Sequence, residues 1–190
     1  LTGESGVGKE LFARAVHDSS ARRGKPFVAI NCAAIPEHLI ESELFGHAPG
    51  AFTGASRHGS PGRLREASSG TLLLDEIGDM PLGLQTRLLR VLQDRTVTPL
   101  GSGQPVAVDF TLICTTHRDL KQAVEQGRFR ADLYYRIAGL ALRLPALRER
   151  EDFVALTQRL LADLGQGEAI EIEPDLLQAL SRHPWPGNLR

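Results

Sequence analysis

The chain carries two short motifs whose residue types suit phosphate chemistry. Residues 3–9 read Gly-Glu-Ser-Gly-Val-Gly-Lys, which fits the phosphate-binding pattern GxxxxGK, and a helical pattern follows at residues 10–17. Glycines let backbone N–H groups curl around phosphate oxygens, the helix N-terminus adds its dipole, and Lys9 would reach the β- and γ-phosphates. A simple glycine-rich turn is the alternative. The next position, where Ser or Thr ordinarily holds Mg²⁺, is Glu10.

The second motif is a pair of acids, Asp75 and Glu76, directly after the apolar run at residues 71–74. A buried apolar strand that ends in two carboxylates needs a reason to place charge there. In our interpretation Asp75 holds Mg²⁺ through water, and Glu76 polarises the water that attacks the phosphate. A helix-capping acid pair is the alternative. Together, the glycine-rich loop and the acid pair predict an ATPase that uses ATP and Mg²⁺.

Both motifs need strands and helices to hold them in place, and the sequence has the patterns for these. Five short apolar runs alternate with amphipathic stretches: Leu1-Thr2 and residues 27–30, 71–74, 110–115 and 140–144. One stretch places four leucines on a single helical face: Leu84, Leu88, Leu89 and Leu92. Strands separated by helices predict an α/β fold, with a parallel five-stranded sheet flanked by helices.

Two regions depart from simple strand–helix crossovers. Residues 46–65 are rich in Gly, Pro, Ser and His and are typical of a long irregular excursion, which inside a compact domain is usually functional. After Pro145 the pattern is helical at residues 151–164 and 174–183, with Glu173-Pro174 as a helix start. We therefore expect a nucleotide-binding core over residues 1–148 and the start of a helical lid over 149–190. Both ends are expected to be truncated, because a strand remnant opens the chain and a helix start closes it.

Composition limits the classes of function. The formal net charge is -1, so the chain has no overall basic field for nucleic acid, and no helix-turn-helix is visible. A DNA-binding module is therefore disfavoured. No apolar run approaches the roughly 18 residues needed to span a membrane, and the cytoplasm is the expected compartment. Cys32 and Cys114 have neither a CxxC partner nor a His at metal spacing, so we expect both to be buried and reduced.

A third motif indicates which class of ATPase the sequence resembles. Residues 50–55 read Gly-Ala-Phe-Thr-Gly-Ala after Glu-Leu-Phe-Gly-His at 43–47, and this GAFTGA stretch resembles the signature loop of the sigma-54 activators, the NtrC-like branch of the AAA+ ATPases. Further matches lie at residues 3–10, 27–34, 70–78, 129–133, 147–152 and 185–190. In that family Glu follows the phosphate-loop lysine, so Glu10 fits. Val7, Ser69 and Ala146 depart from the commonest residues there. Residues 60–66 resemble regulators of the acetoin-catabolism type.

The resemblance implies a role for each matching position around the nucleotide. The implied nucleotide contacts are Gly3, Glu4, Ser5, Gly6, Val7, Gly8, Lys9, Glu10, Thr116, His117 and Arg190. Thr116 and His117 would sense the γ-phosphate at the end of the fourth strand, and Arg190 would contact phosphate within its own chain. Asn31 would be the switch asparagine, which holds Glu76 away from water until nucleotide and target are sensed.

The resemblance also implies contacts with other molecules. Arg130 and Arg136 match arginine fingers, which reach the ATP of a neighbouring subunit and make activity depend on assembly. The loop positions Gly50, Ala51, Phe52, Thr53, Gly54 and Ala55 would bind the amino-terminal part of sigma-54. An exposed Phe52 is a costly apolar display unless a partner covers it. The alternative is that Phe52 packs back onto its own domain.

The implied function is the ATP-hydrolysing central domain of a sigma-54-dependent activator. Such a domain would form a ring, a hexamer, and remodel the closed complex of sigma-54 RNA polymerase holoenzyme through the GAFTGA loop. DNA contact would need a C-terminal domain absent from this sequence, and no membrane contact is expected. One alternative is an AAA+ motor of another type, which has no reason to carry GAFTGA. Another is a nucleotide-binding scaffold without hydrolysis, against which Glu76 and the two arginines argue.

Overall fold

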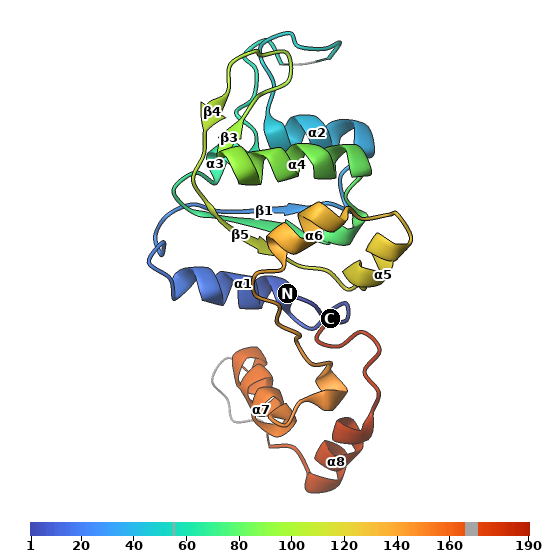
Figure 1. The fold of residues 1–190 in the computed structure, drawn as a ribbon. Helices are drawn as coiled ribbons and strands as arrows, with labels where there is room; N and C mark the ends of the chain where they lie inside the picture. The colour runs from blue at the N-terminus through green and yellow to red at the C-terminus, as the bar shows by residue number, and fades with distance from the viewer. Residues whose placement is uncertain (55, 166–170) are drawn as a thin grey trace. The chain divides into compact units, whose positions relative to one another are not determined.

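The computed structural model describes residues 1–54, 56–165 and 171–190 (Figure 1). Its helices and strands are α1 (Lys9–Asp18), β1 (Phe27–Asn31), α2 (Glu37–Phe45), α3 (Arg63–Glu66), β2 (Thr71–Asp75), the 3-10 helix η1 (Ile77–Asp79), α4 (Leu82–Asp94), β3 (Thr96–Val97), β4 (Val106–Ala107), β5 (Thr111–Cys114), α5 (Leu120–Glu125), α6 (Ala131–Ile137), the 3-10 helix η2 (Leu147–Glu149), α7 (Phe153–Leu164) and α8 (Pro174–Arg182). The predicted α/β class is confirmed. No helix among the described residues is long and apolar enough to cross a membrane.

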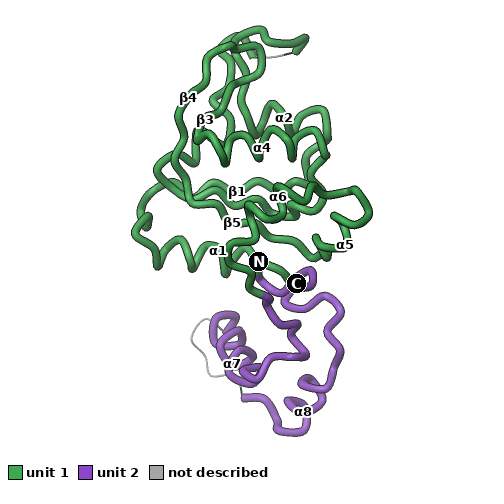
Figure 2. The backbone as a smooth tube through the Cα atoms, in the orientation of Figure 1, with its two compact units in different colours: residues 1–2, 9–142 green, residues 3–8, 143–190 purple. Residues whose placement is uncertain are grey.

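The chain forms two compact units (Figure 2). The first comprises Leu1–Thr2 and Lys9–Leu142, and the second comprises Gly3–Gly8 and Arg143–Arg190. This division differs from the predicted boundary between residues 148 and 149. The glycine-rich loop groups with the later residues because its own contacts are made there, as the site geometry below shows.

The sheet of the first unit is parallel, in the order β1-β2-β5. Thr2 extends this order, because it forms a parallel bridge with Thr116 and its N–H donates to the carbonyl of Leu142 at 2.8 Å. The five predicted extended segments therefore lie side by side, although only three form ladders. The run at 140–144 joins this edge through the carbonyl of Leu142 and is not a strand of the described ladders.

The central strand β2 is buried on both faces, as expected for a parallel sheet covered by helices. Helices α2 and α4 lie on one face of the sheet and α1 lies on the other (Figure 1). The predicted apolar face of α4 is confirmed, since its four leucines are all buried in the core.

The cysteines have no role in crosslinking. Both are free; Cys32 is buried and Cys114 is partly buried. Burial raises the pKa of each thiol to about 12, so neither is a reactive thiolate at neutral pH. The expectation of buried cysteines therefore holds fully for Cys32 and in part for Cys114.

The irregular excursion begins at the end of α2, and its described residues form turns, bends and two isolated bridges of His47 before α3. His47 and Ser60 exchange backbone hydrogen bonds of 3.0 and 2.9 Å, which close the root of the excursion. On its other side, Ala48 N–H donates to the carbonyl of Leu100 at 2.8 Å, and Leu100 N–H donates to Gly46 at 2.9 Å. Leu100 lies in the connection between β3 and β4, so two segments distant in sequence share this root.

Candidate functional site

Asp75 stands at the carboxyl end of β2, where both neighbouring strands hold its side chain. Asn31 pairs with it in register from β1, and Asn31 Nδ2 donates to Asp75 Oδ2 at 2.8 Å. From beyond β5, the hydroxyl of Thr115 donates to Asp75 Oδ1. The carboxylate is therefore fixed in orientation at the edge of the sheet, as a residue that positions a hydrated metal ion must be.

The next residue, Glu76, has a left-handed backbone, with φ 53° and ψ 49°. For a residue with a side chain this conformation costs about 1–2 kcal/mol, and such strain persists only where neighbours enforce it. Here Thr115 does so: its hydroxyl accepts from Glu76 N–H at 3.3 Å, and its carbonyl accepts from Ile77 N–H at 3.0 Å. The left-handed backbone turns the chain sharply at the end of β2, at the residue predicted to act on water.

The carboxylate of Glu76 is also held by neighbours. His117 donates its N–H to Glu76 Oε2 at 3.2 Å, and its Nδ1 lies 2.7 Å from the same oxygen. Lys9 Nζ lies 3.9 Å from Glu76 Oε1, and the two side chains are only 6% and 16% exposed. Lys9, Glu76 and His117 thus meet at one point, as a site for a phosphate group and a water would require.

The expected contact between Asn31 and Glu76 does not occur among the described residues. Asn31 binds Asp75 instead, because the parallel register of β1 and β2 places it opposite that residue. Its Oδ1 accepts from the N–H groups of Ala33 and Ala34, at 2.9 and 3.1 Å. In this structure the neighbour of Glu76 from the adjacent strand end is His117.

The other predicted sensor, Thr116, is buried, and its hydroxyl accepts from the N–H of Arg118 at 3.0 Å. Its backbone N–H donates to the carbonyl of Leu1 at 3.1 Å. Thr116 therefore shapes the turn, whereas the exposed His117 presents its ring to Glu76.

Both predicted arginine fingers are exposed and tied to their own chain. Arg130 makes two hydrogen bonds to Asp132, at 3.0 and 2.7 Å, which lower the pKa of Asp132 and raise that of Arg130. Arg136 donates from Nη2 to the carbonyl of Leu92 at 2.8 Å. Both residues remain exposed, so their role as arginine fingers stays a prediction.

Sequence reasoning missed Gln85, which positions Arg130. This side chain of α4 is fully buried, and its Oε1 accepts from Arg130 N–H at 2.8 Å. Its Nε2 donates to the carbonyls of Met80 and Arg128, at 2.8 and 3.2 Å. A polar residue on the otherwise apolar face of a predicted helix was the available signal.

The glycine-rich loop belongs to the second unit, where Asn188 fixes it. Asn188 Nδ2 donates to the carbonyl of Ser5 at 2.9 Å, while its Oδ1 accepts from Leu147 N–H at 2.7 Å. Leu189 N–H donates to Gly6 at 3.0 Å, and Arg190 Nη1 lies 3.4 Å from Ser5 Oγ. Asn188, Leu189 and Arg190 thus brace the loop. Of these three, the sequence analysis named only Arg190, and as a phosphate contact.

Gly6 is required in this loop because its backbone is left-handed and because another backbone segment lies close to it. At Gly6, where φ is 81°, a Cβ atom would lie 2.2 Å from the carbonyl oxygen of Gly187. Glu4 adds an ion pair with Arg148, whose Nη1 lies 2.9 Å from Glu4 Oε2. Hydrogen bonds from Arg148 and then Asn188 lower the pKa of Glu4 to about 2. Glu4 therefore acts as an anchor of the loop.

The chemistry of these donors fits a magnesium nucleotide. The described residues contain no group of three His, Cys, Asp or Glu that could hold a metal ion by itself. Mg²⁺ commonly takes one or two carboxylates together with substrate phosphates and water, so the single fixed carboxylate of Asp75 suits it. Lys9 and the glycine-rich loop suit the phosphates.

The predicted partner-binding loop presents its aromatic residue at the surface. Phe52 is 41% exposed, and its ring meets the ring of His47 edge-on with centroids 5.3 Å apart. Gly50, Thr53 and Gly54 are exposed, and Ala51 is partly buried. Ala55 lies outside the described residues. Phe52 thus both leans on its own domain and remains available to a partner.

Comparisons with known proteins agree with these motifs. Residues 1–143 match the family model described as the Sigma-54 interaction domain. The whole chain is 55% identical to part of the acetoin catabolism regulatory protein of Cupriavidus necator, covering 29% of that protein. It is 52% identical to part of the DNA-binding transcriptional regulator NtrC of Rhizobium meliloti, covering 40% of it.

A solved structure gives the same result for the fold. NtrX from Brucella abortus, in complex with ATP, matches 99% of this chain with a TM-score of 0.86 and 38% sequence identity. The chain covers 43% of that protein. It therefore spans less than half the length of each of these relatives.

Proposed function

The chain belongs to the sigma-54 interaction domain family and has the AAA+ P-loop fold, and on that basis we propose that it is the ATP-hydrolysing part of a sigma-54-dependent transcription activator. The observation that carries the proposal is the meeting of Lys9, Glu76 and His117 beside the fixed Asp75. This constellation has the positive group, the base and the metal-side carboxylate that phosphoryl transfer to water requires.

The proposed division of labour follows from these contacts. When bound, Mg²⁺ would neutralise charge on the phosphates, and Asp75 would hold the ion through water. Lys9 binds the β- and γ-phosphates, and His117 keeps the carboxylate of Glu76 in place. Glu76 accepts a proton from the attacking water as the bond between the γ-phosphorus and the bridging oxygen breaks. Arg130 or Arg136 of a neighbouring subunit stabilises the charge on the transferred group.

We further propose that hydrolysis moves the GAFTGA loop against sigma-54 in a ring, a hexamer, and so opens the promoter complex. The exposure of Phe52 and Thr53 supports a partner at this loop. The nucleotide can move the loop only if its contacts differ between states. DNA would be bound elsewhere in the full protein, and residues 149–190 would act as the lid over the nucleotide.

Two other functions would share part of this site. An AAA+ motor acting on another target would keep Lys9, Asp75 and Glu76 but would not use Thr53. A scaffold that binds nucleotide without hydrolysis would have no use for a strained, hydrogen-bonded Glu76. The loop and the acid pair favour the activator over both.

The test measures ATP hydrolysis against protein concentration, with and without sigma-54 holoenzyme, for the full protein and its Thr53→Ala variant. We expect hydrolysis to rise steeply with concentration, because an arginine supplied in trans requires assembly. Thr53→Ala should hydrolyse ATP but open no promoter. Promoter opening by Thr53→Ala at the wild-type rate would favour another motor, and absence of hydrolysis under all conditions would favour the scaffold.

A further inference from the structure

Helix α4 touches the catalytic region at two points. Gln85 binds the backbone N–H of Arg130 at 2.8 Å, and the carbonyl of Leu92 accepts from Arg136 at 2.8 Å. The helix also follows closely after Glu76 in the chain, separated from it by η1. A change in the position of the acid pair or of either arginine would therefore bear directly on α4.

On a different face, α4 carries Arg87, which holds two other segments at once. Its Nη1 pairs with Glu41 of α2, and its Nη2 donates to the carbonyl of Thr98 at 3.1 Å. Its guanidinium carbon lies 4.2 Å from the centroid of the Phe45 ring, over the ring face. One side chain thus joins α4, the end of α2, and the segment that follows β3.

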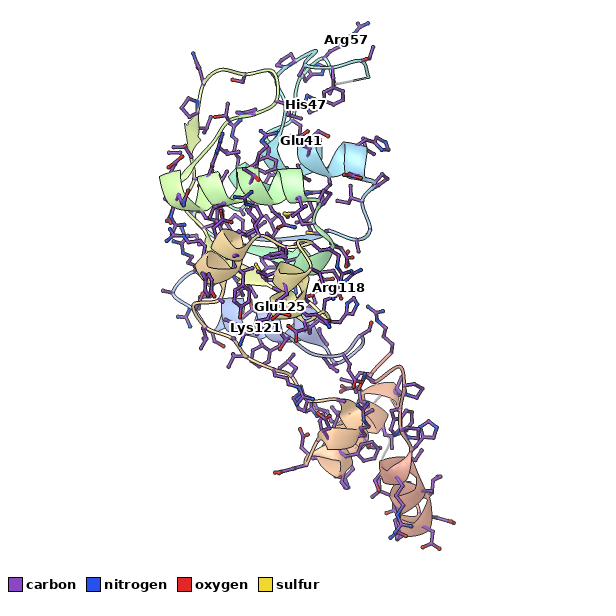
Figure 3. All side chains as sticks on the ribbon, turned by 45° about the vertical axis from the view of Figure 1, so that its right-hand side comes forward. Glu41, His47, Arg57, Arg118, Lys121 and Glu125 are labelled. Carbon is purple, nitrogen blue, oxygen red and sulfur yellow. The ribbon has the colours of Figure 1, made fainter. Side chains whose placement is uncertain are left out.

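Both of those segments lead into the root of the GAFTGA loop. Phe45 directly precedes Gly46, and Leu100 is bonded to Gly46 and Ala48 on either side of His47. Further along, a Cβ atom on Gly101 would lie 2.7 Å from the Cβ of Ala51, so the two segments are in close contact there. Figure 3 shows Glu41 close to α4. His47 lies above it at the root of the excursion, and Arg57 lies toward the far end of the excursion.

We propose that Arg87 is a positioning residue that couples ATP hydrolysis to movement of the GAFTGA loop. The inference rests on the proposed function and adds to it the element that joins the two sites. Motion of α4 reaches the loop through Arg87 because its contacts lie on the two segments that lead to the loop root: Glu41 and Phe45 on α2, and Thr98 two residues before Leu100. Arg87 does not touch the acid pair, so its loss leaves the hydrolytic groups in place.

Arginine suits this position for a geometric reason. A planar guanidinium group can stack on a ring while its separate N–H groups bind a carboxylate and a carbonyl. A lysine ammonium is a point charge and would satisfy Glu41 without holding Phe45 and Thr98 together. The Arg87→Lys variant therefore keeps the positive charge beside Glu41 but loses the contacts with Phe45 and Thr98.

The experiment compares ATP hydrolysis with promoter opening by sigma-54 holoenzyme for the full protein and four variants: Arg87→Gln, Arg87→Lys, Glu41→Gln and Arg90→Gln. Arg90→Gln is the matched control, since Arg90 is an exposed arginine of the same helix. For Arg87→Gln we expect hydrolysis within about twofold of wild type and a loss of about tenfold in opening per ATP hydrolysed. Arg87→Lys should lie between, and Arg90→Gln should match wild type.

Glu41→Gln provides a second route if Arg87→Gln does not fold, and it should also reduce opening per ATP hydrolysed. A fifth variant combines Arg87→Gln with Glu41→Gln. Its promoter opening per ATP hydrolysed should be no lower than that of Arg87→Gln alone, because the two residues act as one pair. Equal opening per ATP in Arg87→Gln and wild type would overturn the inference, as would equal loss in Arg90→Gln or parallel loss of hydrolysis. If wild type itself neither hydrolyses ATP nor opens promoters, the proposed function has failed instead.

Discussion

At the scale of single residues, carboxylates in this chain differ in what holds them and therefore in what they can do. Glu76 is positioned by a histidine and a lysine, as a group that acts on water needs to be. Glu4 is held by a guanidinium group and an amide, Arg148 and Asn188, which keep it ionised. The first arrangement suits the proposed action of Glu76 on water, and the second fixes the glycine-rich loop.

The ionisation of Glu4 gives a pH prediction. Its pKa of about 2 lies below the ordinary value of 4.5, so the pair stabilises the folded loop fully above about pH 4.5 and loses this effect as pH falls through 2. Because the pair is exposed, its contribution to stability is small, and the carboxyl itself should be followed by NMR. We expect Glu4 to stay ionised at about pH 3.5 in wild type and to be largely protonated there in Arg148→Ala.

Arg143→Ala is the control for this titration. Arg143 contributes least among the causes of the shift, so the midpoint of Glu4 should move little when it is removed. A wild-type midpoint near the ordinary value would show that the ion pair with Arg148 is not formed in solution.

At the scale of elements, the irregular excursion is held at its root by close backbone packing. At Gly62, φ is 77°, and a Cβ atom would lie 2.2 Å from the backbone nitrogen of Gly46. Two glycines thus face each other where the chain leaves α2 and returns to α3. This packing holds together the two ends of the excursion that carries the GAFTGA loop.

Replacing Gly62 with alanine should therefore destabilise the first unit. The left-handed conformation alone costs about 1–2 kcal/mol for alanine, and the clash with Gly46 adds to it. Urea unfolding should show Gly62→Ala less stable than wild type by at least that amount. Gly103→Ala is the control: a Cβ there would have no neighbour within 4 Å, so we expect a change within about 0.5 kcal/mol. Equal stability of both variants would contradict the packing argument.

At the scale of the whole molecule, the exposed arginines predict shared sites between subunits. Arg136 donates to the carbonyl of Leu92 and is exposed, so its guanidinium group is open to a neighbouring chain. If it acts in trans, the two halves of one active site come from two chains. An ATP site would then be restored when defective subunits are mixed.

We expect a mixture of Lys9→Ala and Arg136→Ala subunits to hydrolyse ATP well above the sum of the separate variants. In the mixture the Arg136→Ala subunit keeps its ATP site, and its neighbour supplies the arginine, which is worth about 10³-fold or more in rate. A mixture of Lys9→Ala with Glu76→Gln should show no recovery, because both changes damage the same half. If neither mixture recovers activity, Arg136 does not act on the ATP of a neighbouring subunit.

Much of this protein was determined by local sequence. The buried β2, the leucine face of α4 and the helix start at Pro174 all follow from apolar period and helix-start preference, which act over a few residues. The chemical types at the site, Lys9, Asp75 and Glu76, could likewise be recognised from their placement after a glycine-rich loop and at the end of an apolar run. These features depend on residues that are near one another in sequence, so they can be recognised without the contacts between distant segments.

Pairings between distant segments could be decided only by tertiary structure. The register of β1 against β2 places Asn31 on Asp75 and leaves Glu76 to His117, a choice that depends on side-chain reach across strands. Gln85, Asn188 and Arg87 act through partners elsewhere in the sequence; the helical period marks Gln85 as a polar residue on an apolar face, but it does not identify the partners of any of the three. The sequence by itself determined the α/β class, several of the elements and the residue types proposed for chemistry. The packing of the strands and helices decided which residues hold those groups in place, because contacts at long separation arise only when the chain folds.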